Sequence, residues 1–175
     1  MSREYSNGKQ DFYYEENTMI HHISLDAKNP RHVATVLAEI MGGQIVPAPP
    51  NFRPDSWFVL TGDQYGTLVE VLPLGTEMMP DDIEAGFHQG ASAPYVPTHA
   101  YISVQVNAET LQQIGKRENW FVRVCDRGPF DLVEFWIENR QLIEFAPPEM
   151  AAKYLNLLTN PQAMQAALAD LAEAR

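Results

Sequence analysis

The sequence has a single cysteine, Cys125, among its 175 residues. One cysteine cannot form an internal disulfide, and it cannot supply the several thiolates of a structural zinc site. Basic residues are also scarce: 12 lysines and arginines stand against 23 aspartates and glutamates, which gives a net charge of −11. This charge argues against nucleic acid and anionic membrane surfaces as partners, because both are polyanions.

Long apolar runs are missing as well. The longest candidate, VATVLAEIM at residues 33–41, is too short to span a bilayer and contains Glu39. The opening MSREYSNGKQDFYYEEN has no apolar core of the kind that a signal peptide needs. With 45% apolar and 20% charged residues, the composition is that of an ordinary globular protein. We therefore expect one domain that is cytoplasmic.

The order of predicted elements occurs twice along the chain. Asn29 and Pro30 predict the start of a helix that ends at Gly42-Gly43, and Asn107 predicts the cap of a second helix. Each helix follows one predicted strand and precedes three, so each half has the order βαβββ. The predicted segments are an N-terminal arm, a first module, a linker rich in proline and glycine, a second module and a tail with two helices, at residues 1–18, 19–73, 74–97, 98–148 and 149–175.

The same two polar residue types recur in equivalent strands of the two modules. His22 and His99 lie in the opening strands, 77 residues apart, and Glu70 and Glu144 lie in the closing strands LVEVLP and LIEFAP, 74 residues apart. A difference of three residues is what loops between strands tolerate. The correspondence therefore supports an internal duplication.

Strand alternation decides which of these side chains can meet. His22 shares one face of its strand with Ser24, whereas His21 shares the other face with Ile23. Each glutamate faces away from its helix, and a carboxylate at such a position is costly to bury unless it is paired or bound to a cation. Two histidines and two glutamates suit a divalent zinc, nickel, iron, manganese or cobalt ion.

These segments resemble the vicinal oxygen chelate superfamily, which contains glyoxalases, bleomycin-resistance proteins and extradiol dioxygenases. The resemblance covers residues 19–148 and rests on IHHISLDAKNPRHVATVLAEIMGG, GTLVEVLP, THAYISV and NRQLIEFAPP. It implies an α+β fold in which two βαβββ modules form a cupped mixed sheet, here with extra C-terminal helices. It also implies that four side chains bind the metal, in the arrangement of glyoxalase I: His22, Glu70, His99 and Glu144.

The resemblance leaves the reaction open. A glyoxalase-like lyase or isomerase would use Glu144 or Glu70 as the base on a small substrate with neighbouring oxygens. An extradiol-type dioxygenase would need iron, and a drug-sequestering binding protein would need no catalytic metal. We expect a homodimer, whose modules pair within or between chains. Candidate contacts to the small molecule are Trp57, Tyr101, Arg123 and Arg127.

Overall fold

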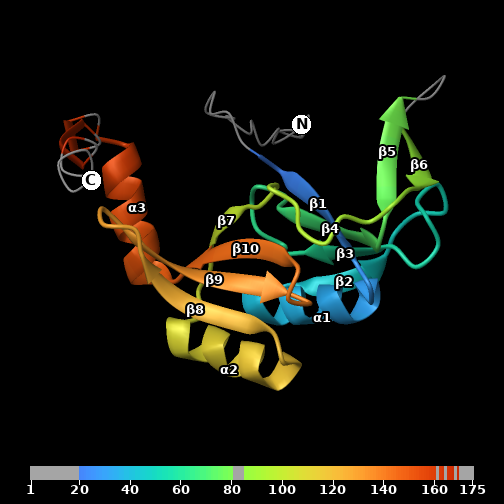
Figure 1. The fold of residues 1–175 in the computed structure, drawn as a ribbon, viewed down its shortest axis with the longest axis horizontal. Helices are drawn as coiled ribbons and strands as arrows, with labels where there is room; N and C mark the ends of the chain where they lie inside the picture. Colours follow the sequence, from blue (N-terminus) through green and yellow to red (C-terminus); the bar gives the residue numbers. More distant parts are fainter. Residues whose placement is uncertain (1–19, 81–84, 161, 164, 168, 170–175) are drawn as a thin grey trace, which may run out of the picture.

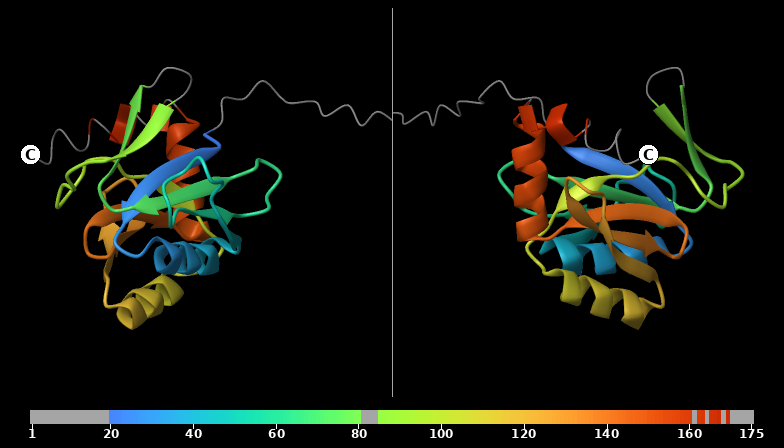
Figure 2. Two further views of the ribbon diagram at one scale, coloured as in Figure 1. Left: turned by 90° about the vertical axis from the view of Figure 1, so that its right-hand side faces the viewer. Right: turned by 60° about the vertical axis from the view of Figure 1, so that its left-hand side comes forward.

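The computed structural model describes residues 20–80 and 85–160, together with 162–163, 165–167 and 169. Its main body consists of two four-stranded sheets, with helices α1 and α2 covering one side of them (Figure 1). Two further views show both helices on this same side, with the sheets above them (Figure 2). The opposite side of the sheets carries the four residues predicted to bind a metal.

The first module forms a sheet with the strand order β1-β4-β3-β2, in which β1 and β4 are parallel and the other neighbours antiparallel. Helix α1 connects β1 to β2, is capped by the Asn29 side chain, and ends at Gly42 in the left-handed conformation. The elements are β1 His22–Ala27, α1 Pro30–Met41, β2 Gln44–Pro47, β3 Trp57–Leu60 and β4 Leu68–Pro73.

The second module repeats this topology with the strand order β7-β10-β9-β8 and a parallel pair of β7 and β10. Helix α2 is capped by Asn107, and Asn119 takes the left-handed position that Gly42 occupies in the first module. The elements are β7 Tyr101–Ser103, α2 Ala108–Glu118, β8 Phe121–Asp126, β9 Asp131–Ile137 and β10 Gln141–Ala146. The predicted duplication of a βαβββ unit is thus present in the fold.

One hydrophobic core joins the two modules. It contains the inward residues of α1, among them Val33 and Leu37, and those of α2, Leu111 and Ile114. Alternate residues of the strands complete it, because successive side chains of a strand point to opposite faces of the sheet. The completing residues are Leu25, Val59, Val69, Val71, Val133, Phe135, Ile143 and Phe145.

The predicted linker, residues 74–97, includes regular secondary structure. It contains an antiparallel pair, β5 Thr76–Pro80 and β6 Ala85–Gln89. Phe87 of this pair packs against Phe52 of the β2–β3 loop, with ring centroids 4.6 Å apart. The pair was missed because its stabilising partner lies in another loop, and no periodic pattern within the linker itself records that contact.

The tail contributes α3, Pro148–Leu158, which packs against β9 and β10. The predicted second tail helix falls largely outside the described residues, as does the predicted N-terminal arm. Within the described part of the chain, no helix is long and apolar enough to cross a membrane.

Candidate functional site

The first histidine–glutamate pair lies on β1 and β4. Ser24 is the parallel register partner of Glu70, and its hydroxyl donates a hydrogen bond of 2.5 Å to Glu70 Oε2. His22 lies two residues before Ser24 and therefore shares its face. Glu70 itself is buried. His21 lies on the other side of the chain and contacts the Tyr65 carbonyl oxygen through Nδ1, at 2.7 Å.

The second pair repeats this arrangement on β10 and the residues before β7. Tyr101 is the register partner of Glu144, as Ser24 is of Glu70. His99 lies two residues before Tyr101, and its Nε2 is 3.6 Å from Glu144 Oε2. In both modules the histidine therefore has the same register relation to the glutamate, and the pairing of faces expected from strand alternation is present.

Sequence reasoning missed Glu134, which is buried on β9 directly opposite Glu144. It accepts hydrogen bonds from Arg123 Nε and Arg127 Nη2, both at 2.7 Å, and from Trp136 Nε1 at 3.2 Å. Arg127 also reaches Glu144 Oε1 at 3.4 Å. Strand alternation in DLVEFWI could have revealed Glu134, because its neighbours Val133 and Phe135 point into the core and Glu134 therefore points away from it. Glu144 has the same relation to its own core neighbours.

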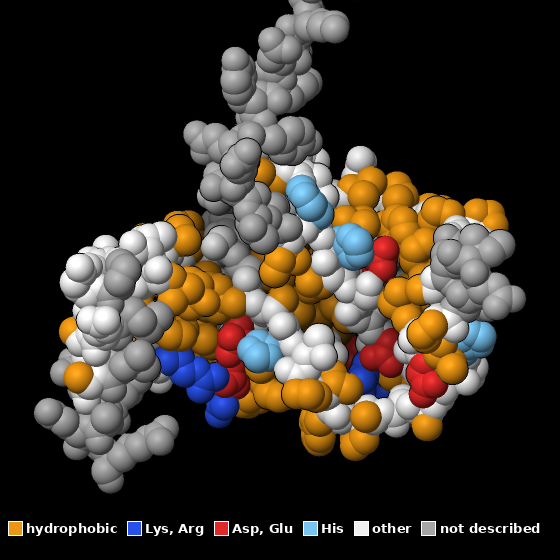
Figure 3. All heavy atoms as spheres, turned by 90° about the horizontal axis from the view of Figure 1, so that it is seen from above, with side chains coloured by type: hydrophobic (Ala, Val, Ile, Leu, Met, Phe, Trp, Pro, Cys, Tyr) orange, Lys and Arg blue, Asp and Glu red, His pale blue; other side chains and the backbone are white. Residues whose placement is uncertain are grey.

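The charge on Glu134 is strongly stabilised. The hydrogen bond from Arg123 lowers the pKa of Glu134 to about 2, against the opposing effect of burial. Figure 3 shows the face that carries this cluster, opposite the helices, where histidine, acidic and basic side chains lie among apolar ones.

We expect Glu134 to make stability depend on pH in acid. Its pKa in the folded chain is about 2, below the ordinary value of 4.5, so the unfolded chain binds more protons between these values. Its contribution is therefore complete above pH 4.5 and is lost as the pH falls toward 2. Urea denaturation of wild type and Glu134→Gln should show a gap in unfolding free energy that narrows over this range. A gap that is constant with pH would contradict the assignment.

Tyr101 lies beside this cluster under α3. Its ring stacks on Tyr154 of α3, with centroids 4.1 Å apart, and meets the edge of Phe130. Burial raises the pKa of Tyr101 to about 12, and the nearby Tyr154 and Glu144 add to the effect. Its hydroxyl is buried and has no hydrogen-bond partner among the described residues. Tyr101 therefore stays protonated at neutral pH next to Glu144.

Trp57 does not join the predicted substrate contacts. It pairs in register with Val71, on the helix-covered face of the first sheet, and Arg31 of α1 lies over its ring at 5.2 Å. Its neighbour Phe58 pairs with Glu70 instead and occupies the site face. Of the four predicted contacts, Tyr101, Arg123 and Arg127 lie on the face of the second sheet that carries Glu144.

A divalent ion needs donor atoms of suitable chemistry that are held close together. Imidazole nitrogens and carboxylate oxygens are suitable donors, so the chemistry of both pairs fits such an ion. Among the residues that the structure describes, however, no three histidine, cysteine, aspartate or glutamate side chains are grouped closely enough to hold one. Each module thus supplies two suitable donors, and the four remain divided between the two sheets.

No family model and no curated protein matches this sequence. Solved structures do match the fold. The lactoylglutathione lyase of Agrobacterium tumefaciens aligns over 76% of this chain and 96% of its own, at 12% identity and a TM-score of 0.52. The fosfomycin resistance protein FosX of Mesorhizobium loti aligns over 78% and 97%, at 10% identity and a TM-score of 0.50. At such identities the likeness concerns the fold.

Proposed function

We propose that this chain, which has the fold of the vicinal oxygen chelate superfamily, is a metal-dependent enzyme of the glyoxalase type. It would be a lyase or isomerase acting on a small substrate that binds a divalent ion through two neighbouring oxygens. The observation that carries the proposal is the duplicated pair: Ser24 and Tyr101 mark the same register position beside Glu70 and Glu144, with a histidine two residues earlier in each module.

The residues that would hold the ion are His22, Glu70, His99 and Glu144. When bound, such an ion polarises substrate oxygens and stabilises negative charge that develops on them. Glu144 is the residue we assign as the general base, because its carboxylate lies between His99 and Arg127, at 3.6 and 3.4 Å. Glu70 is the alternative base.

The two pairs would have to approach one another for this function. We propose that the protein acts as a homodimer, in which modules pair within each chain or between the two chains. Light scattering of the metal-loaded and metal-stripped protein reports the assembly, and a purely monomeric loaded protein would contradict the dimer.

Metal content tests the proposal directly. Protein purified without chelator is expected to carry about one transition-metal ion per site, measured by mass spectrometry of the digested sample. His22→Ala should lose most of this metal, and His21→Ala is the matched control that should keep it, since its side chain lies on the other side of β1. A metal-free wild type, or equal loss from both variants, would refute metal binding at this site. An activity that survives Glu144→Ala would refute the role of Glu144.

A binding protein without a catalytic metal is the second candidate. Arg123 and Arg127 already compensate Glu134, and Arg127 reaches Glu144, so this cluster needs no cation to balance its carboxylates. Such a protein would bind a small molecule in the cup and leave it unchanged. Stoichiometric iron in the purified protein would instead favour the dioxygenase alternative.

A further inference from the structure

We infer that a pocket beside the second histidine–glutamate pair binds the flat aromatic ring of a carboxylate ligand. The inference names the class of substrate for the face of the second sheet that carries Glu144. It rests on the proposed function, because only that function makes the ligand a substrate. The pocket has a volume of about 400 Å³ and is lined by Tyr95, Phe121, Arg123, Trp136 and Asn139. A space of this size accommodates a small organic molecule.

The pocket is continuous with the site face. Arg123 pairs in register with Glu134, which pairs with Glu144, and Phe121 pairs with Trp136 two positions along. All these side chains point to the same side of the second sheet, because alternate residues of a strand share a face. A ligand whose ring enters the pocket would therefore lie beside the second histidine–glutamate pair, with Arg123 between its ring and that pair.

Three aromatic side chains make the pocket suited to a flat ring. Tyr95 and Trp136 meet edge to face with centroids 6.3 Å apart. Tyr95 and Phe121 are 67% and 51% exposed, so part of each ring remains accessible although the Arg123 guanidinium lies over the Phe121 ring, 5.5 Å from its centroid. An aromatic ligand would bury these surfaces and gain edge and stacking contacts with them.

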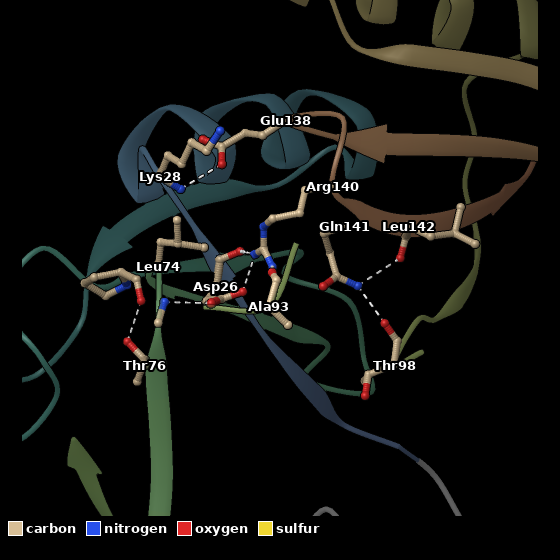
Figure 4. A network of polar contacts seen from close by, with 12 residues as sticks. Asp26, Lys28, Leu74, Thr76, Ala93, Thr98, Glu138, Arg140, Gln141 and Leu142 are labelled. Atoms are coloured by element: carbon tan, nitrogen blue, oxygen red, sulfur yellow. Dashed lines mark hydrogen bonds and ion pairs between the residues drawn. The ribbon is translucent and has the colours of Figure 1, made fainter. Parts of the chain in front are cut away.

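A hydrogen bond from Arg140 holds the part of the linker that carries Tyr95. Ala93 lies two residues before Tyr95. Its carbonyl oxygen accepts a hydrogen bond of 3.5 Å from Nη1 of Arg140, just before β10 (Figure 4). The contact ties this part of the linker to the second sheet. The aromatic wall that Tyr95 contributes is therefore attached to the same sheet that supplies Phe121 and Trp136.

The polar atoms of the lining select an anion. Both polar atoms of Asn139 make hydrogen bonds within the chain, since its Oδ1 accepts from the Phe121 amide and its Nδ2 donates to the Asn119 carbonyl. Trp136 Nε1 donates to Glu134. Arg123 donates Nε to Glu134, and its guanidinium lies over the Phe121 ring. No described carboxylate or carbonyl oxygen accepts from its Nη groups, and its side chain is 55% exposed. These Nη groups are free to bind a ligand carboxylate.

Calorimetric titration with 2-naphthoate tests the inference, using full-length protein stripped of metal with a chelator. Saturable binding with one ligand per chain is expected, and Arg123→Gln should weaken it by about tenfold, the loss of a charge-assisted contact. The neutral 2-naphthamide should bind wild type and Arg123→Gln alike. Arg31→Gln is the matched control: its guanidinium also lies over an aromatic ring, but on the helix-covered face, so naphthoate affinity should not change.

A second variant keeps the test informative if Arg123→Gln unfolds. Trp136→Leu should weaken both naphthyl ligands while preserving the circular dichroism spectrum. Absence of naphthoate binding to wild type, or unchanged affinity in both variants, would overturn the inference. Because the titration uses metal-free protein, naphthoate binding together with failed metal binding would refute only the proposed function, and the reverse result would refute only this pocket.

Discussion

Replacing Phe135 with alanine is expected to lower the free energy of unfolding by about 4 kcal/mol, the usual cost of removing a large ring from a packed core. Phe135 has no exposed surface and meets the rings of Phe145 and Trp120 edge to face, with centroids 5.4 and 5.9 Å apart. Trp120 lies between α2 and β8. The cavity left by Phe135→Ala would therefore weaken the packing of α2 against the second sheet.

Urea denaturation followed by circular dichroism measures this loss. Phe121→Ala is the matched control, since Phe121 lies on the other face of the same sheet and is 51% exposed. We expect it to cost less than about 1 kcal/mol, as surface substitutions generally do. Equal losses from the two variants would mean that the faces of β8 and β9 have been assigned the wrong way round.

Replacing Arg140 with alanine is expected to cost about 3 kcal/mol, at the low end for a buried ion pair that loses one partner. Arg140 is 8% exposed, and its Nη2 donates to the backbone oxygen of Asp26 at 2.5 Å and to the Asp26 carboxylate. The low end applies because the Asp26 side chain is 21% exposed and keeps some access to water. Figure 4 shows Arg140 reaching from the second module to the end of β1.

A second contact between the modules lies beside that of Arg140, at the residues just before α1. Glu138, two residues before Arg140, accepts hydrogen bonds from the amides of Lys28 and Asn29 at 2.7 and 2.9 Å. The loss of Arg140 should therefore weaken the attachment of the β9–β10 turn to the first module. Amide hydrogen exchange of Lys28 and Asn29 should speed up in Arg140→Ala.

Arg117→Ala provides the comparison for Arg140. Arg117 pairs with Glu39 and Glu118 at 2.6 Å, but its side chain is 51% exposed, so its removal should cost less than about 1 kcal/mol. A loss from Arg117→Ala as large as that from Arg140→Ala would show that burial does not distinguish the two arginines.

Much of the fold could be predicted because its signals are local. Asn29 and Asn107 cap their helices as expected, since a short polar side chain before a helical pattern meets free backbone amides. The strands LVEVLP and LIEFAP indicated which residues enter the core, because a strand alternates its faces at every residue. The same rule placed His22 with Ser24 and Glu70, and His99 with Glu144.

Trp57 shows where the local rule was not applied. The sequence predicts it as a substrate contact, but its register with Val71 turns it toward α1. Glu134 obeys the rule, because its position between core residues in DLVEFWI matches that of Glu70 and Glu144 in their strands.

Local patterns are enough to predict the duplicated βαβββ order, the caps of α1 and α2 and the core-facing side of strands such as β4 and β10. Contacts between distant segments establish the rest: Arg123 and Arg127 hold Glu134, Tyr95 lines the pocket of Phe121 and Trp136, and a strand pair lies within the linker. The reason is physical: periodicity and capping depend on neighbouring residues, whereas these contacts join different strands and loops. They form only once the sheets and the shared core bring those segments together.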